Sequence, residues 1–206
     1  MTFVIIHTGV AMYFCLVNFK KTQNMKSLIA IALGLVMQIA TAQEFKVQPE
    51  SSKLSVTGTS TLHDWECVVE TFKGSISATI KNNKIVSIES FNFQFQVDNL
   101  KSGKSAMDKK TYEALREKKN PTITYKGTAV VINDHSATFS GTMIIGGTKR
   151  EFKTKVKISY TNGKIMLSGE KDFKLTDFNI EPPTAVFGTI KTGDEVVIHY
   201  NIQLKN

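Results

Sequence analysis

The feature that most constrains this chain is a two-residue alternation of apolar and polar side chains, which repeats from about Phe45 to the C-terminus. The alternation is clearest in residues 91–97, where phenylalanine occupies successive odd positions, and it returns in residues 196–204. A period of two is typical of strands that bury one face, because successive side chains point to opposite faces of a sheet. The sequence therefore predicts an all-β domain built from consecutive strands.

Short polar segments separate these strands and have the composition of hairpin turns. They are residues 81–84, 133–135, 146–148, 162–163 and 192–194. Asn162-Gly163 between two alternating runs is among the strongest short signals for a hairpin, since both residues tolerate positive φ. Many antiparallel strands in succession need their outer edges covered, and closure into a barrel achieves this. We expect an antiparallel β-barrel of about eight strands, whose interior is either filled by side chains or holds one ligand.

Residues 25–42 have the three parts of a secretory signal peptide. Lys26 supplies a positive charge, residues 28–40 are apolar, and the small residues that end at Ala42 fit a cleavage site. The sequence predicts cleavage between Ala42 and Gln43, and hence a periplasmic or secreted domain of residues 43–206.

Residues 1–24 carry a second apolar run ahead of this signal. Because one signal peptide needs only one such run, we interpret residues 1–24 as a mis-assigned start or an extra N-terminal segment, with translation from Met25. The alternative is that the segment is translated and anchors the protein.

Length and composition limit the classes of function. Residues 43–206 suffice for one hydrophobic core and not for two. The full chain has a formal net charge of +8, but no basic run is dense enough to follow a nucleic-acid backbone, so no nucleic-acid partner is expected. Cys67 is the only cysteine beyond the predicted cleavage site, so an internal disulfide is not expected.

Residues 105–119 depart from the strand period and predict one amphipathic helix. Ser105 and Asp108 fit a capping box, and apolar or small residues then recur at helical spacing as far as Leu115. Asn120-Pro121 ends the segment, because proline cannot continue a helix. A single helix on a barrel either plugs one end or forms a lid over a cavity mouth, and the sequence leaves both interpretations open.

Several ordered segments match the motifs of one known family. They are residues 61–65, 108–112, 120–125, 141–149, 173–180 and 193–196. In this order and spacing they resemble the YceI-like family, and the resemblance covers residues 45–206. It implies an exported, lipocalin-like barrel that holds a long isoprenoid chain. The helix departs from the usual family pattern at residues 111–115, which lack the paired phenylalanines, and this leaves the identity of the lipid open.

The chain has thirteen phenylalanines, mostly at inward-facing positions of the predicted strands, and small residues are interleaved with them on the same faces. The small residues are Gly74, Ala78, Gly127, Ala129, Ala137, Gly141 and Gly169. Alternation of large and small side chains is typical of a filled core, and small side chains on an inner wall also leave room for a ligand. The candidate ligand-binding residues are the large apolar side chains on these faces and on the helix, namely Trp65, Phe91, Phe93, Phe95, Tyr112, Leu115, Tyr125, Phe139, Met143, Phe173 and Phe178.

The residues that carry chemistry do not form a catalytic or metal-binding pattern. His63 and Asp64 are adjacent, so on a strand they point to opposite faces and do not orient one another. No G-x-S-x-G elbow supplies a nucleophile. His63, His135, His199 and Cys67 lack the spacing of a metal site. We therefore expect no catalytic residue, no metal and no cofactor other than a bound lipid.

The prediction for function is an exported protein that holds a polyisoprenoid-type lipid for transport, storage or protection. A membrane would serve only as donor or acceptor of that lipid. The alternative is a structural or partner-binding barrel whose core is filled by its own side chains. Whether the chain forms a homodimer is left open.

Overall fold

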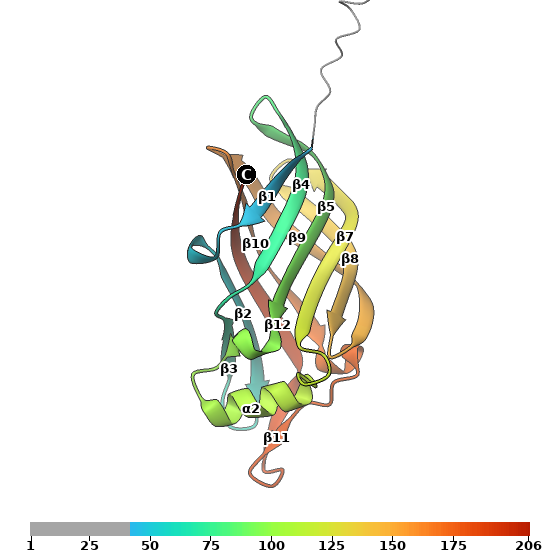
Figure 1. Cartoon of the computed structure of the whole chain (residues 1–206). Helices are drawn as coiled ribbons and strands as arrows, with labels where there is room; N and C mark the ends of the chain where they lie inside the picture. The colour runs from blue at the N-terminus through green and yellow to red at the C-terminus, as the bar shows by residue number, and fades with distance from the viewer. Residues whose placement is uncertain (1–41) are drawn as a thin grey trace, which may run out of the picture. The chain divides into compact units, whose positions relative to one another are not determined.

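The structure, a computed structural model, describes residues 42–206, of which nearly all form one β-barrel (Figure 1). The predicted signal peptide and residues 1–24 lie outside the described residues, apart from Ala42. Within the described part of the chain, no helix is both long and apolar enough to cross a membrane.

Residues 42–206 form twelve strands, one α-helix and three short 3-10 helices. The strands are β1 Gln43–Val47, β2 Lys53–Ser60, β3 Trp65–Val69, β4 Lys73–Lys81, β5 Lys84–Gln96, β6 Leu100–Lys101, β7 Thr122–Asn133, β8 Ser136–Ile145, β9 Thr148–Thr161, β10 Lys164–Lys174, β11 Thr184–Ala185 and β12 Ile190–Lys205. The helices are η1 Pro49–Ser51, η2 Val97–Asn99, α2 Ser105–Ala114 and η3 Leu175–Phe178.

The barrel closes where the first strand meets the last. Lys46 of β1 pairs with Lys205 of β12, and Val47 pairs with Leu204, so the ring runs β1-β4-β5-β7-β8-β9-β10-β12 and returns to β1. Along the chain, β2 follows β1, β3 precedes β4, and β6 follows β5. Strand β2 pairs with β12, β3 with β2, and β6 with β3, so these strands extend the wall toward the end that carries α2. All of these pairs are antiparallel, which confirms the predicted all-β barrel of about eight strands.

Residues that tolerate positive φ form the hairpin turns, as the sequence predicts. Asn82 and Asn83 join β4 to β5, and Asn162 and Gly163 join β9 to β10, all with φ between 50° and 74°. The prediction of a turn at 192–194 is wrong. These residues lie inside β12, where the register against β2 shifts, and the bulge supplies the glycine and the polar residues that suggested a turn.

The predicted helix exists, but it is shorter than 105–119. It ends at Ala114, and Arg116 has a φ of 56°, so the residues up to 119 form turns. The predicted capping box is also wrong, because Ser105 lies inside the helix. Asp108 instead accepts hydrogen bonds from the backbone N–H and the hydroxyl of Ser102, at 2.8 and 2.6 Å, and thereby fixes the chain that enters the helix.

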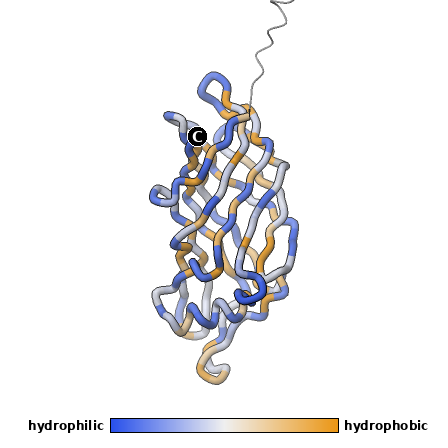
Figure 2. The backbone as a smooth tube through the Cα atoms, in the orientation of Figure 1, coloured by the Kyte–Doolittle hydropathy of each residue, from blue (hydrophilic) through white to orange (hydrophobic). Residues whose placement is uncertain are grey.

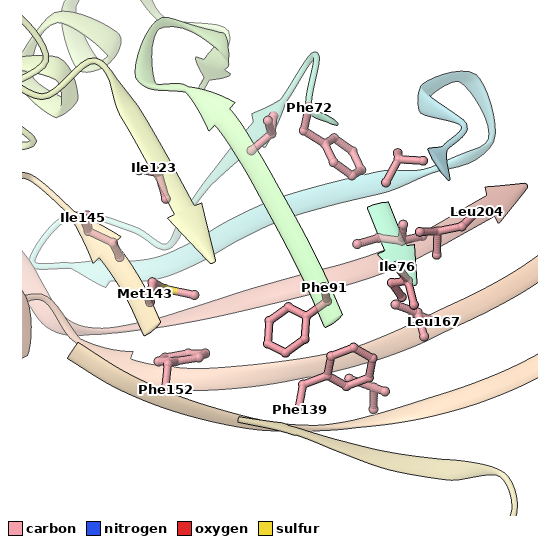
Figure 3. Packing of buried hydrophobic residues seen from close by; sticks show 14 of the residues in the cluster. Phe72, Ile76, Phe91, Ile123, Phe139, Met143, Ile145, Phe152, Leu167 and Leu204 are labelled. Carbon is pink, nitrogen blue, oxygen red and sulfur yellow. The ribbon is translucent and has the colours of Figure 1, made fainter. Parts of the chain in front are cut away.

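The two ends of the barrel differ in how they are filled. At the end near the β4–β5 turn, Phe45, Ile76 and Leu204 are wholly buried and fill the interior. Figure 3 shows Ile76 and Leu204 on one side of Phe91, and Met143 on the other. The packed end leaves the opposite end, beside α2, as the place where the interior can open.

Candidate functional site

An apolar cavity of about 630 Å³ occupies the end of the barrel covered by α2. Its wall includes residues from β2, β3, β5, β7 to β10 and β12, together with α2 and the β11–β12 hairpin. Most of the lining side chains are aliphatic or aromatic. A volume of this size lies in the range of roughly 300–1,000 Å³ that is typical of ligand pockets. At this end, the side chains of the barrel therefore leave part of the interior open.

Eight of the eleven predicted ligand-binding residues line this cavity. They are Trp65, Phe93, Phe95, Leu115, Tyr125, Phe139, Met143 and Phe173. They come from β3, β5, β7, β8, β10 and the turn that follows α2, so residues far apart in the sequence meet around one space. Contact between these side chains and a ligand stays a prediction.

The other three predicted residues lie elsewhere. Phe91 is buried beside the cavity and packs against Tyr125 and Phe139, with ring centroids 4.8 and 5.0 Å apart. Phe178 is buried in η3. Tyr112 turns from the cavity, because its hydroxyl lies 3.0 Å from the carbonyl oxygens of both Asp98 and Leu100. The hydroxyl thus connects α2 to the backbone around η2 by hydrogen bonding.

Four aromatic rings of the inner wall lie against glycines of the neighbouring strand. A Cβ at Gly74 would lie 2.9 Å from Cε1 of Phe93, and one at Gly58 would lie 2.8 Å from Cε2 of Trp65. In both cases the glycine and the aromatic residue are directly paired across the sheet. The pairs Phe91–Gly127 and Tyr200–Gly169 repeat the arrangement.

This pairing explains how a barrel rich in aromatic residues keeps a cavity. A glycine has no side chain, so the ring opposite it can lie sideways on the wall instead of projecting to the barrel axis. The glycine volume is filled by the neighbouring ring, while the space at the axis stays open. Both interpretations of the small residues thus hold, because these residues let aromatic rings pack along the wall and leave space at the barrel axis.

One seam of the barrel wall is held by side chains. The pairing of β9 with β10 extends only from Lys164–Thr161 to Ser168–Lys157. Beyond it, edge-to-face contacts join Phe152 of β9 to Phe173 of β10, and Phe173 to Phe178 of η3, with centroids 6.0 and 5.4 Å apart. These rings close the wall beside the cavity.

Two tyrosine hydroxyls face the interior and are already engaged. Tyr125 Oη lies 3.0 Å from the carbonyl oxygen of Phe139 and 3.1 Å from that of Phe152. Tyr200 Oη lies 2.8 Å from the hydroxyl of Thr154. Burial raises the pKa of both tyrosines above its ordinary value, so both stay neutral, and the interior around them carries no charge from these groups.

Polar groups gather at the mouth of the cavity. Lys104 and Lys110 of the α2 region, Lys171 of β10 and His63 of the β2–β3 loop belong to its lining. The sequence interpretation missed both this rim and the β11–β12 hairpin, whose turn at residues 186–189 was not predicted.

The described residues hold no candidate metal-binding group, and the adjacent His63 and Asp64 do not form a dyad. Nδ1 of His63 bonds the backbone carbonyl of Asp64 at 2.7 Å, so the ring does not engage that carboxylate. No group of three His, Cys, Asp or Glu side chains in residues 42–206 is placed to hold a metal ion. Cys67 is buried, and burial raises the pKa of its thiol from 9.0 to about 12.

Fold and site together define a closed antiparallel barrel with an apolar cavity at one end, an architecture suited to hydrophobic ligands. The model of the YceI-like domain matches residues 45–204, and the chain belongs to this family. No protein of curated function matches the sequence.

Solved structures of related fold include proteins from three bacteria. BcnA of Burkholderia cenocepacia is 16% identical with a TM-score of 0.64, and the match covers 76% of this chain and 98% of BcnA. A polyisoprenoid binding domain from Saccharophagus degradans, implicated in plant cell wall breakdown, is 10% identical with a TM-score of 0.60, covering 78% and 97%. A YceI protein of Campylobacter jejuni is 14% identical with a TM-score of 0.51, covering 63% and 79%. At these identities the likeness concerns the fold.

Proposed function

We propose that this protein binds a long apolar lipid of the polyisoprenoid class in its barrel cavity and carries, stores or protects that lipid. The observation that supports this most is the cavity of about 630 Å³ at the α2 end, with a predominantly apolar wall. The Saccharophagus degradans domain of the same fold, described as polyisoprenoid-binding, supports the choice of lipid class.

The driving force for binding would be the removal of apolar surface from water. At about 25 cal/mol per Å², a chain that buries roughly 400 Å² gains about 10 kcal/mol before the cost of association is subtracted. The neutral, hydrogen-bonded tyrosines place no charge against such a chain.

A role in binding fits the site better than a role in catalysis. The hydroxyls of Tyr125, Thr154 and Tyr200 are occupied by hydrogen bonds within the protein, and the cationic groups lie at the rim. A polar end group of the lipid would therefore remain near Lys104 and Lys110, while its chain extends inward.

The proposal places the protein outside the cytoplasm, after cleavage between Ala42 and Gln43. Its support is the signal-peptide pattern of residues 25–42. Intact mass measurement of protein from the periplasmic fraction would give a chain that begins at Gln43. Retention of residues 1–24 in the isolated protein would contradict both the start at Met25 and the export.

Native mass spectrometry of the protein purified from its own organism tests the lipid directly. We expect a co-purified hydrocarbon species that organic extraction releases and that fragments in five-carbon steps. The variant Val156→Phe tests whether the cavity is the binding site. Val156 is a buried lining residue, so the added ring should reduce the bound species without preventing folding. Protein that remains free of lipid when isolated and when mixed with polyprenol would leave the barrel a structural or partner-binding module.

A further inference from the structure

The β11–β12 hairpin carries the most exposed large apolar side chain of the described residues, that of Phe187. Phe187 is fully exposed and Val186 is 62% exposed, and both lie at its tip. Leu62, 65% exposed, lies on the adjoining β2–β3 loop, since the backbone N–H of Thr61 bonds the carbonyl of Lys191 at 3.0 Å. Figure 2 shows hydrophobic colour at this hairpin, which projects past α2 in Figure 1.

The backbone at the tip is unfavourable for the residues it holds. Val186 and Phe187 have φ values of 50° and 54°, in the left-handed region that β-branched and aromatic residues avoid. Most other non-glycine residues of positive φ in the described chain are Asn or Asp, and none is apolar. The turn conformation favours Asn or Gly at these two positions. The turn itself therefore does not explain why they are apolar.

The tip is held in shape despite this strain. The N–H groups of Gly188 and Thr189 donate to the carbonyl oxygens of Ala185 and Val186, both at 3.1 Å. The hydroxyl of Thr189 also donates to Val186 O at 2.7 Å. The exposed phenylalanine is therefore presented on an ordered turn.

The same hairpin borders the cavity mouth, which contains both apolar and cationic groups. Leu62 and Val186 line the cavity, and so do Lys104 and Lys110. Lys191, exposed, follows the tip on β12. Four carboxylates also lie at this end. Glu113 forms an ion pair with Lys110 at 3.4 Å, and Asp108 accepts hydrogen bonds from Ser102. Asp64 and Glu181 are exposed.

We propose that this end of the barrel docks on the surface of a lipid bilayer with anionic headgroups. Phe187, Val186 and Leu62 would enter the region between headgroups and acyl chains, and Lys104 and Lys191 would meet the phosphates. Docking in this orientation sets the cavity mouth against the membrane, where an apolar chain can pass without crossing water. A membrane surface fits better than a protein partner because the apolar group is a small protruding tip, with lysines at the adjoining cavity mouth and on β12, and not a flat patch.

Vesicle flotation tests the docking with the processed protein isolated from cells. Vesicles of phosphatidylethanolamine and phosphatidylglycerol should bind it more strongly than vesicles of phosphatidylcholine. Phe187→Gly should weaken binding to both by about ten-fold or more, since it removes the inserted ring. Because glycine accepts the φ of this position, the variant should fold at least as well as the parent, which separates lost docking from lost folding.

Two further changes make the comparison specific. Val131→Ser removes an apolar side chain that is 61% exposed near the β7–β8 turn, at the opposite end of the barrel, and should leave vesicle binding unchanged. Lys191→Gln should weaken binding about five-fold on the anionic vesicles alone. Phe187 is not part of the cavity lining, so lipid carried by Phe187→Gly, measured by native mass spectrometry, should equal that of the parent.

Three results would overturn the proposal. Equal vesicle binding by the parent and by Phe187→Gly would mean that the tip does not contact the membrane. Absence of binding by the parent would mean that the protein does not dock on this membrane at all. A parent that is dimeric in sedimentation, and that Phe187→Gly makes monomeric, would assign the tip to a contact between two copies. Vesicle binding through Phe187 by a protein without internal lipid would leave docking intact and refute the lipid-carrier function instead.

Discussion

Gly58→Ala is the substitution that tests most directly how the cavity is kept open. Gly58 on β2 pairs with Trp65 on β3, and the indole ring lies over the glycine. An added Cβ would lie 2.8 Å from Cε2 and 3.1 Å from Cη2, whereas carbon atoms in contact stand about 3.5–4.0 Å apart. Since the atoms nearest the new methyl group all belong to the indole, the ring must move by about 1 Å and the backbone can stay.

The movement has a definite energetic consequence. The indole Nε1 donates to the carbonyl of Thr59 at 3.0 Å, and a displaced ring loses this bond, which contributes about 1 kcal/mol. Lost contact between the ring and the wall adds a similar amount. Alanine has fewer conformations than glycine in the unfolded chain, and this difference stabilises the folded state by about 0.4–1 kcal/mol. The free energy of unfolding should therefore fall by about 1 kcal/mol, which lowers Tm by roughly 2–4 °C in a domain of this size.

Three measurements check this reasoning. Trp65 is the only tryptophan of the chain, so its emission spectrum reports the ring directly and should change in Gly58→Ala. Bound lipid, measured by native mass spectrometry, should decrease because the ring moves toward the cavity that it lines. In a double-mutant cycle, Trp65→Phe should relieve the clash, so the effects of the two substitutions on stability should not add.

The reasoning would be refuted by a Gly58→Ala variant that is more stable than the parent, with unchanged emission and unchanged lipid. Such a result would mean that the ring does not rest on the glycine. An additive double-mutant cycle would contradict the proposed contact in the same way, whatever the stability of the single variants.

Three other predictions concern the seam, the helix and the buried thiol. Phe173→Ala should lower the free energy of unfolding in urea by about 2–4 kcal/mol, because Phe173 joins two rings across the β9–β10 seam; Phe173→Leu should cost less. Tyr112→Phe should cost about 1 kcal/mol and speed hydrogen exchange in α2, since its hydroxyl bonds the chain around η2. Burial, assisted by nearby Asp108 and Glu66, raises the pKa of Cys67 from 9.0 to about 12. The folded state therefore keeps a proton that the unfolded state loses, so stability should fall between pH 9 and 12, and Cys67→Ala should reduce that fall.

The barrel could be predicted because its determinants are local. The alternation in residues 91–97 sets which face of β5 is buried, and Asn162-Gly163 sets a hairpin whatever the rest of the chain does. The prediction failed at residues 192–194, where a glycine and polar residues mark a bulge inside β12. It also failed at the start of α2, where Asp108 binds Ser102 and not a capping serine at 105. A bulge and a turn use the same residue types, and only pairing with β2 tells them apart.

The site was harder to predict from the sequence than the fold, because the register of strand pairing decides which side chains line the cavity. A list of inward-facing aromatic residues cannot separate Phe91, which is buried beside the cavity, from Phe93, which lines it two positions later on the same face. Tyr112 sits at a spacing that suits a lid, yet its hydroxyl turns it toward the backbone around η2.

Whether the interior is open or filled could not be read from composition, because the volume of a ring is the same wherever it points. The barrel axis stays free because Gly58, Gly74 and Gly169 each stand directly opposite an aromatic residue, and this coincidence is a property of strand pairing. A shift of one residue in any of these pairs would turn an aromatic side chain to the outside, and a shift of two would set it opposite a residue with a Cβ and push the ring inward. The cavity is therefore a consequence of the register that the short turns and the bulge in β12 fix, and substitutions that alter those features should change ligand capacity before they change the fold.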